Sequence, residues 1–78
     1  MELEATITVR KNCADVEKLF RVELQHLQQE RSGVTLTKKK QTLSFQIKAK
    51  DSIALRSTMN GITKLLTVYE KAQSLENE

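Results

Sequence analysis

Two stretches of strict alternation between apolar and polar residues constrain this chain more than any other feature. In residues 2–9, and again in residues 42–49, an apolar side chain stands at every second position. Successive side chains of a strand point to opposite faces of a sheet, so each stretch predicts a strand with one buried face. Residues 34–37 alternate in the same way, and only the lysine-rich residues 38–41 separate them from the next strand. A connection this short predicts an antiparallel hairpin.

The segment between the first and second predicted strands has helical spacing instead. From residue 13 to about residue 29 the apolar positions recur three or four residues apart, which places them on one face of a helix. Asn12 precedes this segment and is the predicted N-terminal cap. Gly33 follows it and is predicted to end the helix as its C-terminal glycine.

A second helix is predicted to follow the hairpin. Asp51 or Ser52 is expected to cap it, it runs to about Gln73, and residues 75–78 are expected to form a frayed acidic tail. The order is therefore β-α-β-β-α in a single domain over residues 1–78. This order predicts an α+β fold, in which a three-stranded antiparallel sheet, with the third strand in the middle, carries two helices on one face.

A chain of 78 residues, of which 38% are apolar, has material for only a thin core. One core at this length rarely contributes more than about 3–5 kcal/mol, and small domains usually add a disulfide, a metal or a partner chain. Cys13 and His26 are the only cysteine and histidine, so a single chain can build neither a disulfide nor a multi-ligand zinc site. A partner chain is the remaining source of stability.

The sequence carries no recognisable catalytic feature. No nucleophile elbow, phosphate-binding loop or dinucleotide fingerprint occurs, and Cys13 belongs to no catalytic motif. We therefore expect a protein that is not an enzyme and uses no cofactor, no metal and no small-molecule substrate. No apolar run reaches about 18 residues, and the first residues lack the features of a signal peptide, so we expect no membrane association and a cytoplasmic location.

The second predicted helix has an unusually wide apolar surface. One stripe consists of Leu55, Met59, Ile62, Leu66 and Tyr69. A second stripe, displaced by about a third of a turn, consists of Ala54, Gly61, Leu65, Val68, Ala72 and Leu75. Either both stripes belong to the core or one of them is an interface, and the small size of the domain favours the interface. Gly61 adds weak support, because a glycine inside a helix costs about 1 kcal/mol and close approach of another backbone would explain it.

Positive charge is concentrated in the middle of the chain. Residues 31–64 contain eight basic residues and one acid, whereas the flanks contain five bases and nine acids. Five lysines in this region are candidate phosphate contacts: Lys38, Lys39, Lys40, Lys48 and Lys50. A solvated face that keeps the protein soluble explains them equally well. The lysines also discourage strand pairing at residues 34–37, so residues 2–9 form the preferred edge for sheet extension.

The second helix carries a family resemblance. Residues 51–69 read D-S-I-A-L-R-S-T-M-N-G-I-T-K-L-L-T-V-Y, and this segment resembles the C-terminal helix of the small dimerisation subunit of the KEOPS complex, also called the CTAG or Pcc-type family. The matching positions are Asp51, Ala54, Leu55, Arg56, Ser57, Asn60 and Lys64. Gly61 stands where the family usually has serine, and Leu65 stands where an aromatic residue is common. The element order and the chain length agree as well.

The resemblance implies a role in tRNA modification. KEOPS makes N6-threonylcarbamoyladenosine at position 37 of tRNA, and its small subunit is not catalytic. That subunit binds helices of the threonylcarbamoyl-transferase subunit, dimerises with itself or with a paralogue, and contributes to tRNA binding. Carried over by position, the residues that divide between core, dimer and transferase contacts are Leu55, Met59, Ile62, Leu65, Leu66, Val68 and Ala72. The family signature consists of Asp51, Arg56 and Asn60.

Two other functions are consistent with the sequence. A stand-alone RNA-binding module would use the basic hairpin and the sheet face, although the outward strand positions offer no aromatic side chain for base stacking. A small homodimer without a nucleic-acid role is the third hypothesis.

Overall fold

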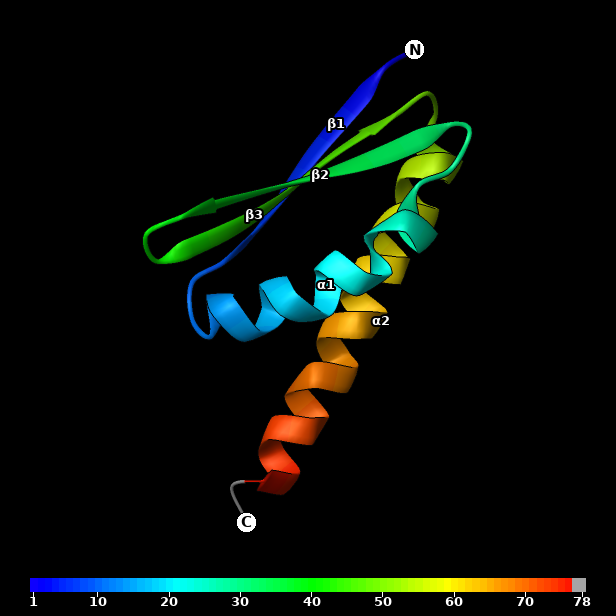
Figure 1. The fold of residues 1–78 in the computed structure, drawn as a ribbon. Helices are drawn as coiled ribbons and strands as arrows, with labels where there is room; N and C mark the ends of the chain where they lie inside the picture. Colours follow the sequence, from blue (N-terminus) through cyan, green and yellow to red (C-terminus); the bar gives the residue numbers. More distant parts are fainter. Residues whose placement is uncertain (77–78) are drawn as a thin grey trace.

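Figure 1 shows the fold in a computed structural model, which describes residues 1–76. The elements in chain order are β1 (Leu3–Val9), α1 (Cys13–Leu27), β2 (Ser32–Lys39), β3 (Thr42–Ala49) and α2 (Ser52–Glu76). The three strands form one layer, and both helices lie on the same side of it. The predicted β-α-β-β-α order and the α+β architecture are confirmed.

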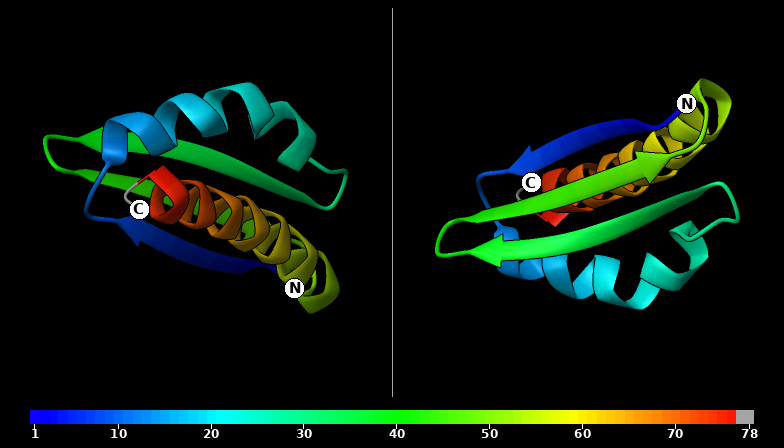
Figure 2. Two further views of the ribbon diagram at one scale, coloured as in Figure 1. Left: turned by 90° about the horizontal axis from the view of Figure 1, so that it is seen from below. Right: turned by 90° about the horizontal axis from the view of Figure 1, so that it is seen from above.

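The sheet has the strand order β1-β3-β2, and both pairings are antiparallel. This confirms the prediction that the third strand lies in the middle. Figure 2 shows the sheet from above, with α2 running beneath it and α1 on the side of β2. Ala5 and Val34 both stand opposite Ile47, so the alternation of the three strands is in phase. One face of the sheet is therefore mainly apolar and faces the helices, and Ser32 and Lys38 of β2 are polar residues on it.

The core lies between this apolar face and the helices. Phe20 of α1 and Phe45 of β3 are fully buried, and their rings meet edge to face with centroids 4.6 Å apart. Ile47 and Ile62 are also fully buried, so α2 joins the same cluster. The opposite face of the sheet is polar and open to solvent, as the alternation predicts.

α1 begins where the sequence predicts, but its C-terminal end differs from the prediction. Asn12 occupies the N-cap position, but it adopts a left-handed conformation (φ 58°, ψ 32°) and its side chain makes no cap hydrogen bond. α1 ends at Leu27, and the prediction that Gly33 ends the helix is wrong, since Gly33 lies inside β2 without a positive φ. The physical reason is a tight turn after α1, in which the Gln29 N–H donates to the Ser32 carbonyl at 2.9 Å and leads the chain directly into β2.

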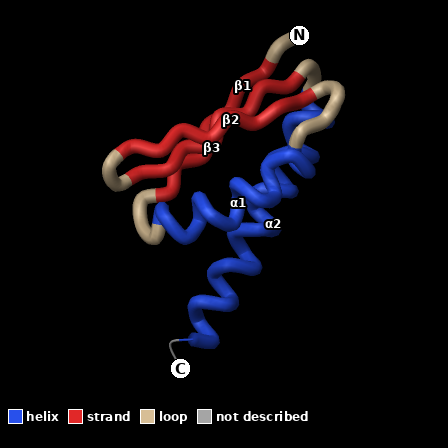
Figure 3. The backbone as a smooth tube through the Cα atoms, viewed as in Figure 1, coloured by secondary structure: helices blue, strands red, loops and turns tan. Residues whose placement is uncertain are grey.

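β2 and α2 are both longer than predicted. β2 extends two residues beyond each end of the predicted segment 34–37, so only residues 40–41 remain between the strands of the hairpin (Figure 3). α2 ends at Glu76 rather than near Gln73. Of the frayed tail predicted for residues 75–78, the first two residues are helical and the last two lie outside the described residues.

α2 begins as predicted and then diverges from the sheet. Asp51 Oδ1 accepts the Ala54 N–H at 2.8 Å, which makes Asp51 the N-terminal cap of this helix. The helix has 25 residues, or about 37 Å at 1.5 Å per residue. β3 has 8 residues, or about 27 Å. α2 is inclined to the strands, so its C-terminal part extends away from the sheet, as Figure 1 shows, and it stays within the outline of the sheet in the view from above (Figure 2).

Candidate functional site

The predicted interface residues of α2 fall into three groups of different burial. Ile62 is fully buried and is therefore a core residue. Four residues are half-buried and pack against the core: Leu55, Met59, Leu65 and Leu66. Val68 and Ala72 are exposed, Val68 by 63%. Only the last two have most of their surface free for another molecule.

Burial along α2 depends both on the position along the helix and on the stripe. In the second stripe, Ala54 near the start of the helix is buried, whereas Val68 and Leu75 near its end are exposed. In the first stripe, Tyr69 is half-buried, and its hydroxyl donates to Asp15 Oδ2 of α1 at 3.4 Å. In the first half of α2 both stripes belong to the core, which is one of the two predictions for the apolar surface. In the second half the second stripe is exposed to solvent, which the other prediction requires.

Gly61 has a close neighbour within its own chain. A Cβ added at this position would lie 3.0 Å from Leu27 Cδ2, at the end of α1. The idea that Gly61 permits the approach of another backbone from a partner is therefore corrected, because a side chain of α1 occupies that space. The glycine allows the last residue of α1 to pack against α2.

The signature residues lie in the first part of α2 and differ in their contacts. Asp51 caps the helix and forms an ion pair with Arg31 at 2.9 Å. The Ala54 N–H and the Arg31 guanidinium hold the pKa of Asp51 below its ordinary value of 3.8. The side chains of Arg56 and Asn60 are exposed on the helix surface. The fold therefore explains Asp51, while the other two are free for contacts outside the chain.

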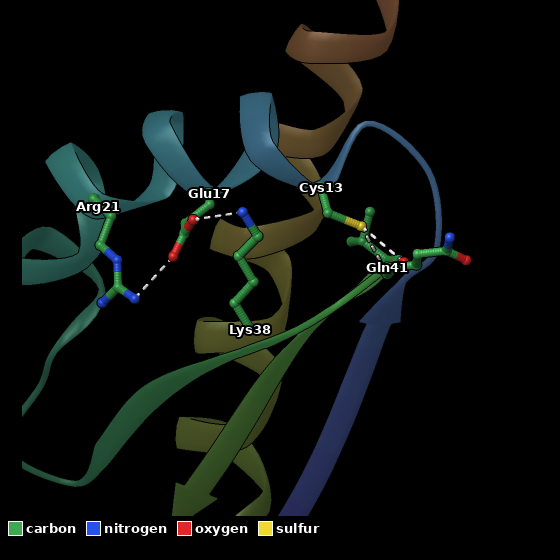
Figure 4. A network of polar contacts seen from close by, with 6 residues as sticks. Cys13, Glu17, Arg21, Lys38 and Gln41 are labelled. Carbon is green, nitrogen blue, oxygen red and sulfur yellow. Dashed lines mark hydrogen bonds and ion pairs between the residues drawn. The ribbon is translucent and has the colours of Figure 1, made fainter.

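Lys38 is turned away from the other candidate phosphate contacts. It stands in register with Leu43 and points to the helix side of the sheet, where its Nζ lies 3.5 Å from Glu17 Oε1. The other oxygen of Glu17 accepts from Arg21 at 3.0 Å (Figure 4). The hydrogen bond from Arg21 has the largest effect on the pKa of Glu17. Together with the hydrogen bond from Lys38 and the positive charges of both side chains, it holds this pKa below its ordinary value of 4.5. Lys38 thus ties β2 to α1.

The remaining four lysines form two clusters rather than one surface. Lys39 and Lys40 lie where β2 turns into β3, which we call the hairpin end. Lys48 and Lys50 lie at the other end of β3, about 20 Å away at strand spacing. There the Lys48 Nζ stands 3.8 Å from Glu4 Oε1 on β1. A hollow of about 450 Å³ at that end is lined by three acids and three bases, so it carries no excess of positive charge.

The two edges of the sheet are covered differently by the chain itself. On β2, the side-chain amide of Gln28 donates from Nε2 to the Val34 carbonyl at 2.8 Å and accepts the Val34 N–H at Oε1 at 3.2 Å. Next to it, Gln29 and Ser32 exchange backbone hydrogen bonds. Sequence reasoning does not single out Gln28, because a glutamine after a helix has no pattern that reveals a contact with a strand. The contact of Gln28 with Val34 could have been predicted only if the start of β2 had been known.

The groups that could carry chemistry have structural roles or none. Cys13 is buried, and its Sγ donates to the carbonyls of Val9 and Gln41, both at 3.3 Å (Figure 4). It fastens the start of α1 to β1 and to the hairpin turn. His26 is exposed on α1. Within residues 1–76 no three acidic, cysteine or histidine side chains gather to hold a metal, and no helix is long and apolar enough to cross a membrane.

Comparison with known protein families extends the resemblance over nearly the whole chain. The family described as "Transcription factor Pcc1" matches residues 2–74. This range contains every strand, α1 and all but the end of α2, so the match rests on the complete fold and not only on the signature helix. A search among curated proteins finds no significant match. The chain belongs to the Pcc1 family, whose members are non-catalytic subunits of the KEOPS complex.

Proposed function

We propose that this chain is the KEOPS subunit that binds the threonylcarbamoyl-transferase subunit through its helices and joins two copies of the assembly during synthesis of N6-threonylcarbamoyladenosine at position 37 of tRNA. The observation that carries the proposal is the exposed apolar face on the C-terminal half of α2. Val68 is 63% exposed and Leu75 is 74% exposed, and Ala72 is exposed between them. Contiguous apolar surface of this kind marks an interface.

The spacing of this face suits a helical partner. Positions 68, 72 and 75 are four and three residues apart, which is the repeat of a face that packs against another helix. α1 lies antiparallel to α2, since Leu27 is near Gly61 and Asp15 is near Tyr69. Two helices of the transferase laid against this pair would complete a four-helix bundle around the exposed residues.

A single substitution tests the transferase contact. Val68→Asp places a charge in the middle of the exposed face and should abolish co-elution with the transferase subunit. Thr67→Asp is the matched control, because it adds the same charge about 100° around the helix from Val68, where Thr67 is exposed. Size-exclusion chromatography with in-line light scattering gives the mass of each mixture. A Val68→Asp variant that still co-elutes like the control would exclude this face as the binding site.

The edge of β1 is our candidate for joining two copies. A two-fold axis at Thr6 would pair all seven residues of β1 with those of a second copy in antiparallel fashion. In that register Ala5 faces Ile7 on the apolar side, and Glu2 of one copy faces Arg10 of the other. The pairing is therefore complementary in charge as well as in apolarity. Thr6→Pro removes a backbone donor at the centre of the strand and should leave a monomer by light scattering.

The hairpin end is the candidate tRNA contact, and it also favours the stand-alone RNA-binding module as a second function. Lys39 and Lys40 are exposed there, and Arg10 leaves β1 at the same end. Replacing both lysines by glutamine should lower the salt dependence of tRNA affinity by about one unit of slope per lost phosphate contact. Lys48→Gln with Lys50→Gln is the matched control at the other end of the sheet. Equal slopes in wild type and both variants would remove the hairpin end as a phosphate contact.

A further inference from the structure

The β2 edge of the sheet is already occupied by groups of its own chain. In antiparallel sheets alternate residues direct both backbone groups to the same neighbour. Val34 gives its N–H and its carbonyl to the Gln28 amide, and Ser32 exchanges hydrogen bonds with Gln29. On β2, every second residue counted from Ser32 therefore directs its backbone N–H and carbonyl away from β3. At the first two of these positions, Ser32 and Val34, groups of the same chain form the hydrogen bonds.

The β1 edge lacks such a cover. Ile47 does not use its backbone groups on Val34, so it directs them to Ala5 on the other side, and Thr6 then faces outward. No hydrogen bond within residues 1–76 reaches the outward backbone groups of Glu4, Thr6 or Thr8. Figure 2 shows the same asymmetry in the helices, because α1 lies along the side of β2 and not along β1. The β2 edge is thus covered at Ser32 and Val34, at the end next to α1, whereas the β1 edge has no such cover within residues 1–76.

We propose that the side chain of Gln28 closes the β2 edge, so that another strand can join the sheet only at β1. A glutamine side chain has one donor and one acceptor in the same arrangement as a peptide unit, and it can therefore stand in for one residue of a neighbouring strand. An uncovered edge is a template for further pairing. With one edge closed, pairing of two copies through β1 ends in a closed dimer; with both edges open, it would continue into a chain of copies. This inference rests on the proposed pairing through β1.

A second observation explains the residue beside this contact. Gly33 lies in the strand, where a glycine is unfavourable. A Cβ added there would lie 3.0 Å from Gln28 Oε1. The absence of a side chain at Gly33 thus makes room for the glutamine amide to reach Val34. Lys38 and Lys39 at the far end of β2 add charge that discourages pairing there as well.

The test removes the hydrogen bonds of Gln28 while keeping its shape. Gln28→Met is nearly isosteric and has neither donor nor acceptor of comparable strength. Gln25→Met is the matched control, because Gln25 is exposed on α1 and its side chain makes no hydrogen bond within the described chain. Light scattering over a range of protein concentrations should show a mass that stays constant for wild type and control. For Gln28→Met the mass should exceed the wild-type mass and rise with concentration.

Amide exchange by NMR reports the contact directly. The Val34 N–H should exchange about tenfold faster in Gln28→Met, the factor that one hydrogen bond of ordinary strength contributes. Faster exchange without any rise in mass would overturn the proposal, as would unchanged exchange. Thr6→Pro distinguishes a failure of this inference from a failure of the proposed pairing through β1. If Thr6→Pro leaves wild-type association unchanged, pairing through β1 fails; if Thr6→Pro is monomeric while Thr6→Pro with Gln28→Met again associates, the β2 edge has been opened.

Discussion

The two halves of α2 have similar apolar content and opposite surroundings. In the first half, Ala54, Thr58 and Ile62 are buried beneath the sheet. In the second half, Val68 and Leu75 point into solvent although they continue the same helical surface. The difference arises because α2 is inclined to the sheet, so that its C-terminal half lies farther from the strands than its first half does (Figure 1). Burial along this helix is decided by how it packs in the fold and not by its hydrophobicity.

This contrast separates the two tasks of α2. The first half holds the domain together, so substitutions there should change the free energy of unfolding. In the second half Val68, Ala72 and Leu75 are exposed, so substitutions at these three positions should change partner binding and leave the fold intact. The following predictions probe this division, beginning with the largest expected change in stability.

Ile62→Ala should be the most damaging of these substitutions. Ile62 is fully buried at the centre of the core, and removing its methyl and ethyl groups leaves a cavity. We expect a loss of about 2–5 kcal/mol in the free energy of unfolding. Urea denaturation followed by circular dichroism measures it, with Val68→Ala as the control from the second half. Equal losses for the two variants would contradict the division of α2.

The buried hydroxyl pair of Ser32 and Thr58 gives the next largest effect. The two hydroxyls hydrogen-bond to each other between the start of β2 and α2. Ser32→Ala leaves the Thr58 hydroxyl buried without its partner and should cost about 1–3 kcal/mol. Adding Thr58→Val removes the stranded group and should recover part of that loss. The free energies of unfolding of the two single variants and the double variant, measured by denaturation, give the coupling energy between Ser32 and Thr58. Strictly additive losses of stability would show that the two hydroxyls do not act as a unit.

Asp51 should make the start of α2 sensitive to acid. Its pKa is lower in the folded chain than the ordinary value of 3.8, because the carboxylate accepts the Ala54 N–H and faces Arg31. A lowered pKa means that the stabilisation is complete above about pH 4 and is lost as the pH falls through the folded-state value. Asp51→Ser keeps a capping oxygen without the charge, so stability should fall less between pH 5 and pH 2. Thermal melts across that range compare the two proteins, and parallel curves would exclude Asp51 as a contributor.

Val68→Asp should have the smallest effect on stability. Val68 is 63% exposed, and valine and aspartate have similar helix propensities, so the free energy of unfolding should change by less than about 0.5 kcal/mol. The same variant should nevertheless lose transferase binding. Thermal denaturation monitored by circular dichroism provides the comparison. A variant that unfolds at a much lower temperature would place Val68 in the core of the domain rather than in its interface.

Much of the fold followed from local patterns, and the misses have physical causes. Alternation in β1 and β3 predicted both strands, and the short connection after residues 34–37 predicted the hairpin. Gly33 was assigned to the end of α1, because a glycine after a helix usually ends it; the turn at Gln29 ended α1 earlier and left the glycine to β2. Long-range hydrogen bonds of this kind have no counterpart in a local pattern.

The candidate site was predicted less completely than the fold. The sequence indicates the apolar positions of α2, yet it could not divide core from surface among them, since Ile62 and Val68 are both apolar residues of one helix and only the packing in the fold separates them. The lysine-rich segment was likewise treated as one group. Register places Lys38 beside Glu17 on the helix side, while Lys39 faces the other side of the sheet.

The sequence by itself determined the periodicities, and with them the element types, the strand order and the family signature, because these depend on neighbouring residues and on simple rules of connection. The tertiary structure alone decided what each element meets. It set the inclination of α2 to the sheet, which lysine joins the ion pair with Glu17, and that Gln28 covers the β2 edge at Val34. Those outcomes depend on the lengths and registers of several elements together, and no single stretch of sequence determines them.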